Sequence, residues 1–232
     1  MCSSDLPDLP VFLVWAEDPA QSSSLYEGLK DYATRVIFDS ESTENLPEFA
    51  KTVLAKEKSG FFEVGDLNWA RLDSFRSLIS STFSDPLKGK KLQNLDSISI
   101  IYNAQETPFF CHTKIQAIYL QAWLVTRLKL PKDHKIKISL EGIKNSKMPP
   151  GMVISLELKT TEEDSFVFSR DEKHPNQICF EYSTKESCSL PFYTEASKRE
   201  SGKSLVKEVC HKGTSPHYIE ALEYIVSGGI SC

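Results

Sequence analysis

The sequence has few glycines, and none of them lies where a phosphate-binding loop would need one. Ten glycines occur in 232 residues, without a GxGxxG or GxxxxGK[ST] pattern. Nucleotide-binding folds need glycines where the first strand meets its helix, because the backbone approaches the phosphates closely there. After the apolar run at residues 11–15, the chain instead reads AEDPAQSSS. The sequence therefore predicts no nucleotide cofactor.

The motifs of nucleophilic and metal-assisted catalysis are also missing. No GxSxG or CxxC pattern occurs, and the six cysteines and five histidines fit no common zinc spacing. The adjacent pairs Cys111-His112 and Cys210-His211 would point about 100° apart on a helix, so neither forms a nucleophile with its base. We expect no catalytic residues, no metal ligands and no cofactor. These absences favour a binding or regulatory protein over an enzyme.

Basic charge and long apolar runs are scarce as well. The net charge is -5, and the one dense basic run is KGKK at residues 88–91. We interpret this run as a solvated loop, and a contact to phosphate or to an acidic partner is the alternative. No stretch is apolar enough to span a bilayer, and the N-terminus lacks the pattern of a secretory signal. The sequence predicts a cytoplasmic protein with free thiols that binds neither nucleic acid nor membranes.

The most apolar segment, residues 109–128, is predicted to be a buried helix. Apolar side chains cover most of its circumference, which is typical of a core helix. Residues 97–103 before it and residues 135–142 after it carry the β-branched residues of strands. This spacing predicts a strand, a crossover helix and a second parallel strand.

A second unit of this kind is predicted near the N-terminus. Its strands are residues 11–15 and 35–40, and the helix between them spans residues 24–33. The continuous apolar run at 11–15 indicates a central strand. In the helix, Leu25 and Leu29, together with Tyr32 or Ala33, are expected to form the apolar stripe.

The C-terminal part has a different pattern. From Met152 onward, three short alternating strands follow one another without helices, which predicts an antiparallel meander. Two helices are predicted to follow, at residues 197–213 and 215–227. The predicted fold class is α/β, with a mixed sheet, parallel β-α-β units in the N-terminal half, the meander and the C-terminal helices. We expect residues 1–145 and 146–232 to form two portions of one continuous domain.

Residues 63–85 are predicted to form one helix or two abutting helices. On an unbroken helix, Trp69, Asp73 and Arg76 share one face, and Arg71 lies beside them. A tryptophan flanked by arginines is a typical anchor at protein interfaces. The alternative is that Trp69 belongs to the core and the arginines pair with nearby carboxylates.

Four motifs in one order resemble the OpcA family, the glucose-6-phosphate dehydrogenase assembly and activator proteins. They are DLPVFLVW, RVIFDS, DLNWARLDSFR and IYLQAWLVTRLKL, within residues 6–130. Family members typically carry a substantial region before the first of these motifs, and this sequence begins almost at that motif, so the resemblance implies the partner more firmly than the mode of action. Carried over residue by residue, the family's Asp-Leu-x-Trp-x-Arg-Leu element, with its following arginine, corresponds to Asp66, Leu67, Trp69, Arg71, Leu72 and Arg76.

The resemblance implies a non-catalytic assembly factor that binds glucose-6-phosphate dehydrogenase and favours its active form, in the oxidative pentose phosphate pathway. The partner-interface candidates are Trp69, Arg71 and Arg76. Replacing Trp69 and Arg76 by alanine is expected to abolish activation and to leave the fold intact. The alternative is a sugar-phosphate-binding protein or enzyme with its site at the C-terminal ends of the parallel strands, around Glu17, Asp18 and Asp39. A third hypothesis makes the scattered thiols a redox switch on the activator.

Overall fold

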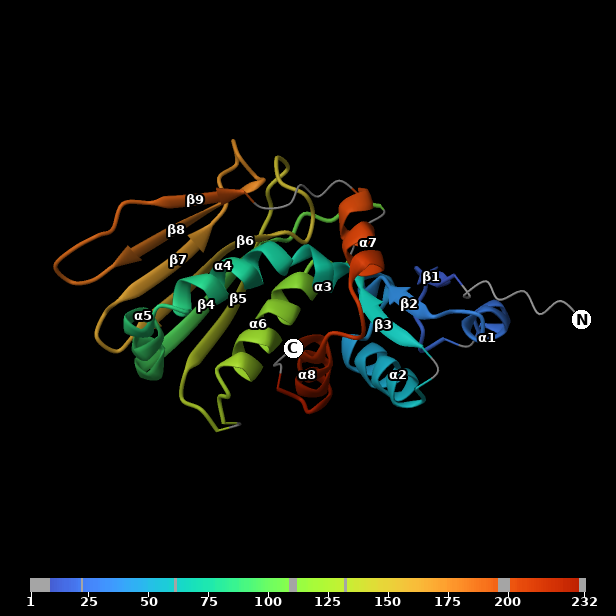
Figure 1. Cartoon of the computed structure of the whole chain (residues 1–232). Helices are drawn as coiled ribbons and strands as arrows, with labels where there is room; N and C mark the ends of the chain where they lie inside the picture. The colour runs from blue at the N-terminus through green and yellow to red at the C-terminus, as the bar shows by residue number, and fades with distance from the viewer. Residues whose placement is uncertain are drawn as a thin grey trace, which may run out of the picture.

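The computed structural model describes residues 9–21, 23–60, 62–108, 112–131, 133–195 and 201–229. These residues form two β-sheets with helices packed between and around them (Figure 1). Helices α6 (Ile115–Arg127) and α8 (Pro216–Val226) lie between the six-stranded sheet and the three-stranded sheet in Figure 1. The predicted fold class is confirmed, with parallel β-α-β units, an antiparallel meander and C-terminal helices.

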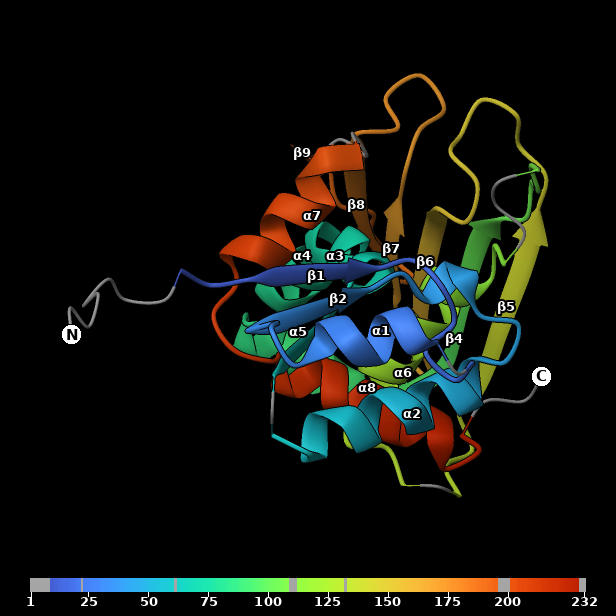
Figure 2. The ribbon, with the colours of Figure 1, turned by 90° about the vertical axis from the view of Figure 1, so that its right-hand side faces the viewer.

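The smaller sheet is entirely parallel, in the order β1-β2-β3. Its strands are β1 (Phe12–Trp15), β2 (Arg35–Phe38) and β3 (Glu63–Asp66), and the crossovers are α1 (Ser24–Lys30) and α2 (Leu46–Lys58) (Figure 2). The predicted parallel pairing of the first two strands is confirmed. The prediction that residues 11–15 form a central strand is wrong, because β2 is central and buried throughout, whereas β1 pairs on one side only among the described residues.

Helix α1 buries a different face from the one that its pattern predicted. Leu25 and Leu29 are 62% and 40% exposed. Tyr26 is buried instead, with its ring 5.1 Å from that of Trp15 and 6.4 Å from that of Phe38. The helix has only seven residues, and its one large aromatic side chain determines which face packs on the sheet.

The larger sheet has the order β5-β4-β6-β7-β8-β9. Strands β4 and β5 are parallel, and every other neighbouring pair is antiparallel. The predicted meander is confirmed, and a fourth strand, β9, extends it. The bounds of these strands are β4 (Leu95–Asn103), β5 (Lys137–Ile143), β6 (Val153–Thr160), β7 (Ser165–Ser169), β8 (Gln177–Ser183) and β9 (Phe192–Glu195).

Helix α6 is the crossover between β4 and β5, and it lies in the core as predicted. Tyr119, Leu120 and Ala122 are fully buried, and even its polar Gln116 and Gln121 are buried. The helix begins at Ile115 and not at residue 109, because residues 112–114 form a turn. Residues 109–111, with Cys111, lie outside the described residues.

Several shorter elements connect these layers. Helix α5 (Pro86–Lys91) corrects the prediction that the KGKK run is a loop: the Asp85 side chain caps it, and Pro86 suits its first turn. The other elements are the helices α3 (Leu67–Arg71), α4 (Asp73–Phe83) and α7 (Ser201–Cys210), and the 3-10 turns η1 (Ser40–Ser42) and η2 (Leu92–Asn94). The two predicted C-terminal helices, α7 and α8, are confirmed.

Strands from both sides of residue 145 join in the larger sheet, since β4 and β5 precede this position and β6 to β9 follow it. Buried side chains of both sheets and of the helices between them form a continuous apolar cluster. The division into portions 1–145 and 146–232 stays a prediction. No helix in the described part of the chain is both long enough and apolar enough to cross a membrane.

Candidate functional site

The segment from Asp66 to Arg76 turns from a strand into two abutting helices. At the end of β3, the Asp66 carboxylate accepts a hydrogen bond from the Trp69 backbone N–H (2.8 Å) and a second from that of Ser40 (3.1 Å). Burial raises the pKa of Asp66 to about 7, while these two bonds oppose the rise. Leu72 separates α3 from α4 but keeps helical backbone angles, so the helical spacing continues. Trp69, Asp73 and Arg76 therefore lie on one side, as predicted.

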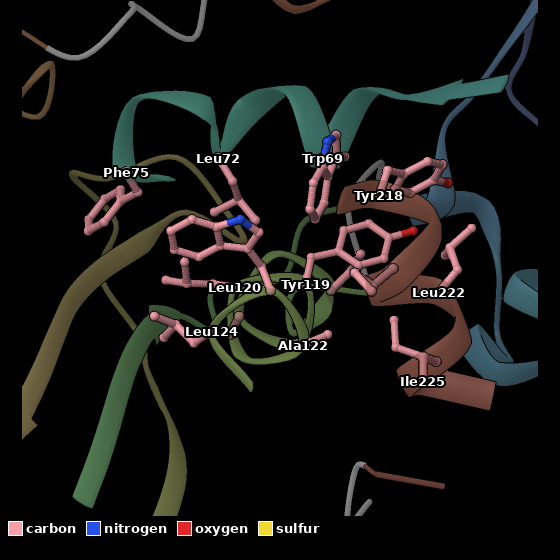
Figure 3. Close-up of a cluster of buried hydrophobic side chains, with 14 of the residues drawn as sticks. Trp69, Leu72, Phe75, Tyr119, Leu120, Ala122, Leu124, Tyr218, Leu222 and Ile225 are labelled. Atoms are coloured by element: carbon pink, nitrogen blue, oxygen red, sulfur yellow. The ribbon is translucent and has the colours of Figure 1, made fainter. Parts of the chain in front are cut away.

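Trp69 is buried, with 4% of its surface exposed. Its ring lies 6.1 Å from that of Tyr119 on α6 and 5.4 Å from that of Tyr218 on α8. Figure 3 shows the three rings meeting where α3, α6 and α8 come together. Trp69 thus belongs to the core on one side, while it also lines a cleft on the other.

Arg76 lies flat on Trp69. Its guanidinium carbon is 3.8 Å from the centre of the ring, and its Nη1 donates a hydrogen bond to the Trp69 carbonyl (2.6 Å). The nearest carboxylate, Asp73, is 3.7 Å from Nη2. Burial lowers the pKa of Arg76 to about 10, so the side chain remains charged at neutral pH. The stack and the hydrogen bond together fix the position of this cation.

Arg71 points to a different place. Its Nη1 donates to Asn68 (2.7 Å) and lies 3.5 Å from the Glu41 carboxylate and 3.9 Å from that of Asp39. The three interface candidates are therefore not brought together, because only Trp69 and Arg76 line the cleft. As contacts to a partner, all three stay a prediction.

The carboxylates at the C-terminal ends of the parallel strands are mainly engaged in local bonds. Asp18 accepts hydrogen bonds from the Ala20 N–H and the Thr43 hydroxyl, both 2.9 Å long. Asp39 accepts from Asn68 (3.1 Å) and caps the turn η1. Glu17, the third member of this group, is exposed. These contacts order the ends of the strands, and a sugar-phosphate site at this place stays a prediction.

The cleft lies between α3 and α4 on one side and α7 and α8 on the other. Its volume is about 370 Å³. We call it the Trp69–Arg76 cleft. Its walls combine aromatic, hydroxyl and charged side chains, namely Arg35, Trp69, Asp73, Arg76, Ser77, Ser80, Trp123, Lys207, Glu208, His211, Ser215, His217 and Tyr218.

A buried ion pair attaches α7 to the parallel sheet beneath the cleft. Arg35 on β2 is 1% exposed, and its Nη2 donates to the Glu208 carboxylate on α7 (2.6 Å). Its Nη1 donates to the backbone carbonyls of His211 (2.9 Å) and Gly213 (2.8 Å). Burial raises the pKa of Glu208, and the charge of Arg35 opposes this rise. The arginine thus holds the end of α7 and the turn that follows it.

We expect the substitution Gly65→Ala to destabilise the protein by about 1 to 3 kcal/mol, as overpacking does. A Cβ atom at this position would lie 2.2 Å from Oε2 of Glu208 and 3.0 Å from Nη2 of Arg35, so the ion pair would have to move. Gly28→Ala is the matched control, because a Cβ atom there meets nothing within 4 Å. The higher helix propensity of alanine should raise the free energy of unfolding by up to about 1 kcal/mol. Urea unfolding of both variants measures the difference, and equal stabilities would contradict this packing.

The described thiols and histidines form no metal site. No group of three or more histidine, cysteine, aspartate or glutamate side chains in the described part of the chain could hold a metal ion. Cys179 is buried and free, and Cys188 and Cys210 are exposed and free. Cys2, Cys111 and Cys232 lie outside the described residues, so the hypothesis of a redox switch stays untested.

The sequence interpretation missed the residues that position the cleft, Arg35, Glu208, Tyr119 and Tyr218. The sequence did contain one signal, the arginine at the start of the apolar strand RVIF. If that strand is central, the arginine is buried and needs a partner. Nothing in the sequence placed that partner on α7, since the two ends of the ion pair are 173 residues apart.

Comparisons with known proteins point to one family. The family model for the C-terminal domain of the glucose-6-phosphate dehydrogenase subunit matches residues 62–222, which include all of α3, α4 and α7. The OxPP cycle protein OpcA of Synechocystis sp. is 30% identical over 124 residues, or 53% of this chain and 24% of that protein. Its namesake in Synechococcus elongatus is 24% identical over 183 residues, or 68% of this chain and 39% of that protein. The chain thus spans well under half of the length of these relatives.

Solved structures share the fold at low sequence identity. KijD10, a 3-ketoreductase from Actinomadura kijaniata in complex with TDP-benzene and NADP, aligns with a TM-score of 0.56 and 12% identity, over 94% of this chain and 74% of that one. The protein yvaA of Bacillus subtilis aligns with a TM-score of 0.52 and 11% identity, over 94% of this chain and 77% of that one. These likenesses concern the fold alone.

Proposed function

The chain belongs to the OpcA family, and on this premise we propose that it acts in the oxidative pentose phosphate pathway by binding glucose-6-phosphate dehydrogenase. In this proposal the protein is a non-catalytic, cytoplasmic assembly factor that favours the active form of the dehydrogenase. The single observation that carries the proposal is the family match, which includes the whole segment around Trp69 and Arg76.

Binding alone does not activate a partner. An activator must bind the active state of the enzyme more tightly than the inactive state, and its effect cannot exceed that difference in affinity. A contact with a fixed geometry serves this purpose better than a flexible one, because less side-chain entropy is lost when it forms. Arg76 meets this requirement, since Trp69 holds its guanidinium in one position.

The turn after β1 supports the non-catalytic part of the proposal. Dinucleotide-binding proteins hold phosphate at the corresponding turn. The turn that follows β1, residues 16–23, contains no glycine. A close approach of the backbone to a pyrophosphate needs glycines at this turn. The likeness to oxidoreductase structures therefore supports a common fold and not a common chemistry.

We expect this chain to co-elute with the glucose-6-phosphate dehydrogenase of the same organism in size-exclusion chromatography and to raise its activity. Arg76→Gln should weaken binding about 30-fold or more, which corresponds to the loss of a hot spot of about 2 kcal/mol or more. Arg71→Gln is the matched control, because this arginine pairs with Glu41 outside the cleft and should change the affinity less than about threefold.

Circular dichroism and thermal unfolding establish that both variants are folded before their binding is compared. Absence of both co-elution and activation with the wild-type chain would contradict the proposed function. Equal losses in the Arg71 and Arg76 variants would contradict the assignment of the contact to the cleft. Co-elution without a change in activity would contradict the proposed activation but would support the proposed binding to the dehydrogenase.

A further inference from the structure

The charges that line the Trp69–Arg76 cleft do not balance. Arginine and lysine side chains supply three cations at its border, Arg35, Arg76 and Lys207, and they face two carboxylates, Asp73 and Glu208. Glu208 pairs with Arg35 at 2.6 Å, and Asp73 forms an ion pair with Lys207. Among the described residues, Arg76 is thus the cation that has no carboxylate to itself.

The donors of Arg76 are also mostly unused. A guanidinium carries five N–H donors, and in the described part of the chain one of its nitrogens has an acceptor, the Trp69 carbonyl. The Asp73 oxygen at 3.7 Å is too far away for a hydrogen bond. Arg76 is nevertheless largely buried, with 12% of its side chain exposed. No nitrogen of Arg76 is among the described buried atoms that lack a partner, so its unused donors reach the solvent in the cleft, where a ligand can accept their hydrogen bonds.

We propose that the Trp69–Arg76 cleft binds a small oxyanion, a phosphate or carboxylate group, on the free edge of Arg76. The planar guanidinium matches both groups by paired hydrogen bonds. Ser77 and Ser80 place hydroxyls on the same wall, and Trp123 and Tyr218 add aromatic surface against which the body of a small molecule packs. The volume of about 370 Å³ lies within the range of small-molecule sites.

This site does not depend on the proposed function, because the chain alone forms the whole cleft. The cleft is a different place from the alternative site at the strand ends, where Asp18 and Asp39 supply negative charge. In the cleft the unpaired charge is positive, so the ligand must be an anion.

The test places a carboxylate beside Arg76 within the protein. Ser80 is exposed and lies one helical turn from Arg76, so in Ser80→Asp the new charge would occupy the position of the ligand. Ser81→Asp is the matched control, because it adds the same charge to the same helix but points about 100° away, and Ser81 lines another face.

Isothermal titration calorimetry of the whole chain with inorganic phosphate, and separately with acetate, measures binding at constant ionic strength set with sodium chloride. We expect saturable binding of at least one of the two probes by the wild type, and the probe that binds more tightly identifies the preferred group. The affinity should fall at least about tenfold in Ser80→Asp and change less than about twofold in Ser81→Asp.

Two results would overturn the proposal. One is the absence of saturable binding of either probe by the wild type, and the other is equal affinity in Ser80→Asp and Ser81→Asp. Arg76→Lys provides a second measurement, since it keeps the charge but removes the planar fork. Its affinity should lie between those of the wild type and Ser80→Asp, and wild-type affinity in this variant would also count against the site.

Discussion

Replacing Trp69 by alanine is expected to lower the free energy of unfolding by about 3 to 5 kcal/mol, the usual range for deleting a large buried aromatic side chain. The ring fills the space where α3, α6 and α8 meet, and its removal leaves a cavity against Tyr119 and Tyr218. Arg76 would also lose the surface that orients its guanidinium. Chemical unfolding followed by circular dichroism measures the loss.

The control for this prediction is an exposed aromatic side chain. Tyr32 is 76% exposed, so Tyr32→Ala should change stability by less than about 0.5 kcal/mol. A loss below about 1 kcal/mol in Trp69→Ala would contradict the burial of the ring. Because Trp69 is buried, we no longer expect Trp69→Ala to leave the fold intact. This variant cannot test the interface, since unfolding alone would reduce activation. Arg76 is the better position for that purpose.

Replacing Arg35 by methionine is expected to destabilise the protein by about 3 to 5 kcal/mol, as breaking one side of a buried ion pair does. Glu208 is 7% exposed and would lose its nearest cation, and the carbonyls of His211 and Gly213 would lose their donor. Urea unfolding gives the magnitude. Helix α7 should loosen first, because Arg35 holds its C-terminal end.

A double substitution separates the charge effect from the packing effect. Adding Glu208→Met to Arg35→Met removes the uncompensated carboxylate and should recover a large part of the loss. Arg71→Met is the matched control. The Arg71 side chain is 19% exposed and forms its own ion pairs, so this substitution should lower the free energy of unfolding by about 1 kcal/mol or less. Equal losses at Arg35 and Arg71, or no recovery in the double variant, would contradict the role of the pair.

Local sequence patterns predicted most of the elements, because these depend on neighbouring residues. The strands β2, β4 and β6 to β8 are rich in β-branched and aromatic residues, and Ser215 with Pro216 marks the start of α8. Strand β3 was missed, since its sequence EVGD has one β-branched residue and a glycine. The edge position of β1 could not be predicted either, because strand order depends on contacts between distant segments.

The candidate site was predictable only in part. Helical spacing correctly placed Trp69, Asp73 and Arg76 on one side, but it could not show that Trp69 faces Tyr119 and Tyr218 from two other helices. The same spacing put Arg71 beside them, whereas Glu41 and Asn68 draw that side chain elsewhere. Which charges remain unpaired in a cleft depends on all the elements that border it.

The distance along the chain between Arg35 and Glu208 also bears on how the protein is made. The two residues are 173 positions apart. At about 5 to 20 residues per second, a ribosome needs roughly 9 to 35 s to add Glu208 after Arg35. Until then the central strand of the parallel sheet carries a charge that has no buried partner on α7. The N-terminal sheet, although it is synthesised before α7, therefore acquires this partner of Arg35 only after α7 has emerged.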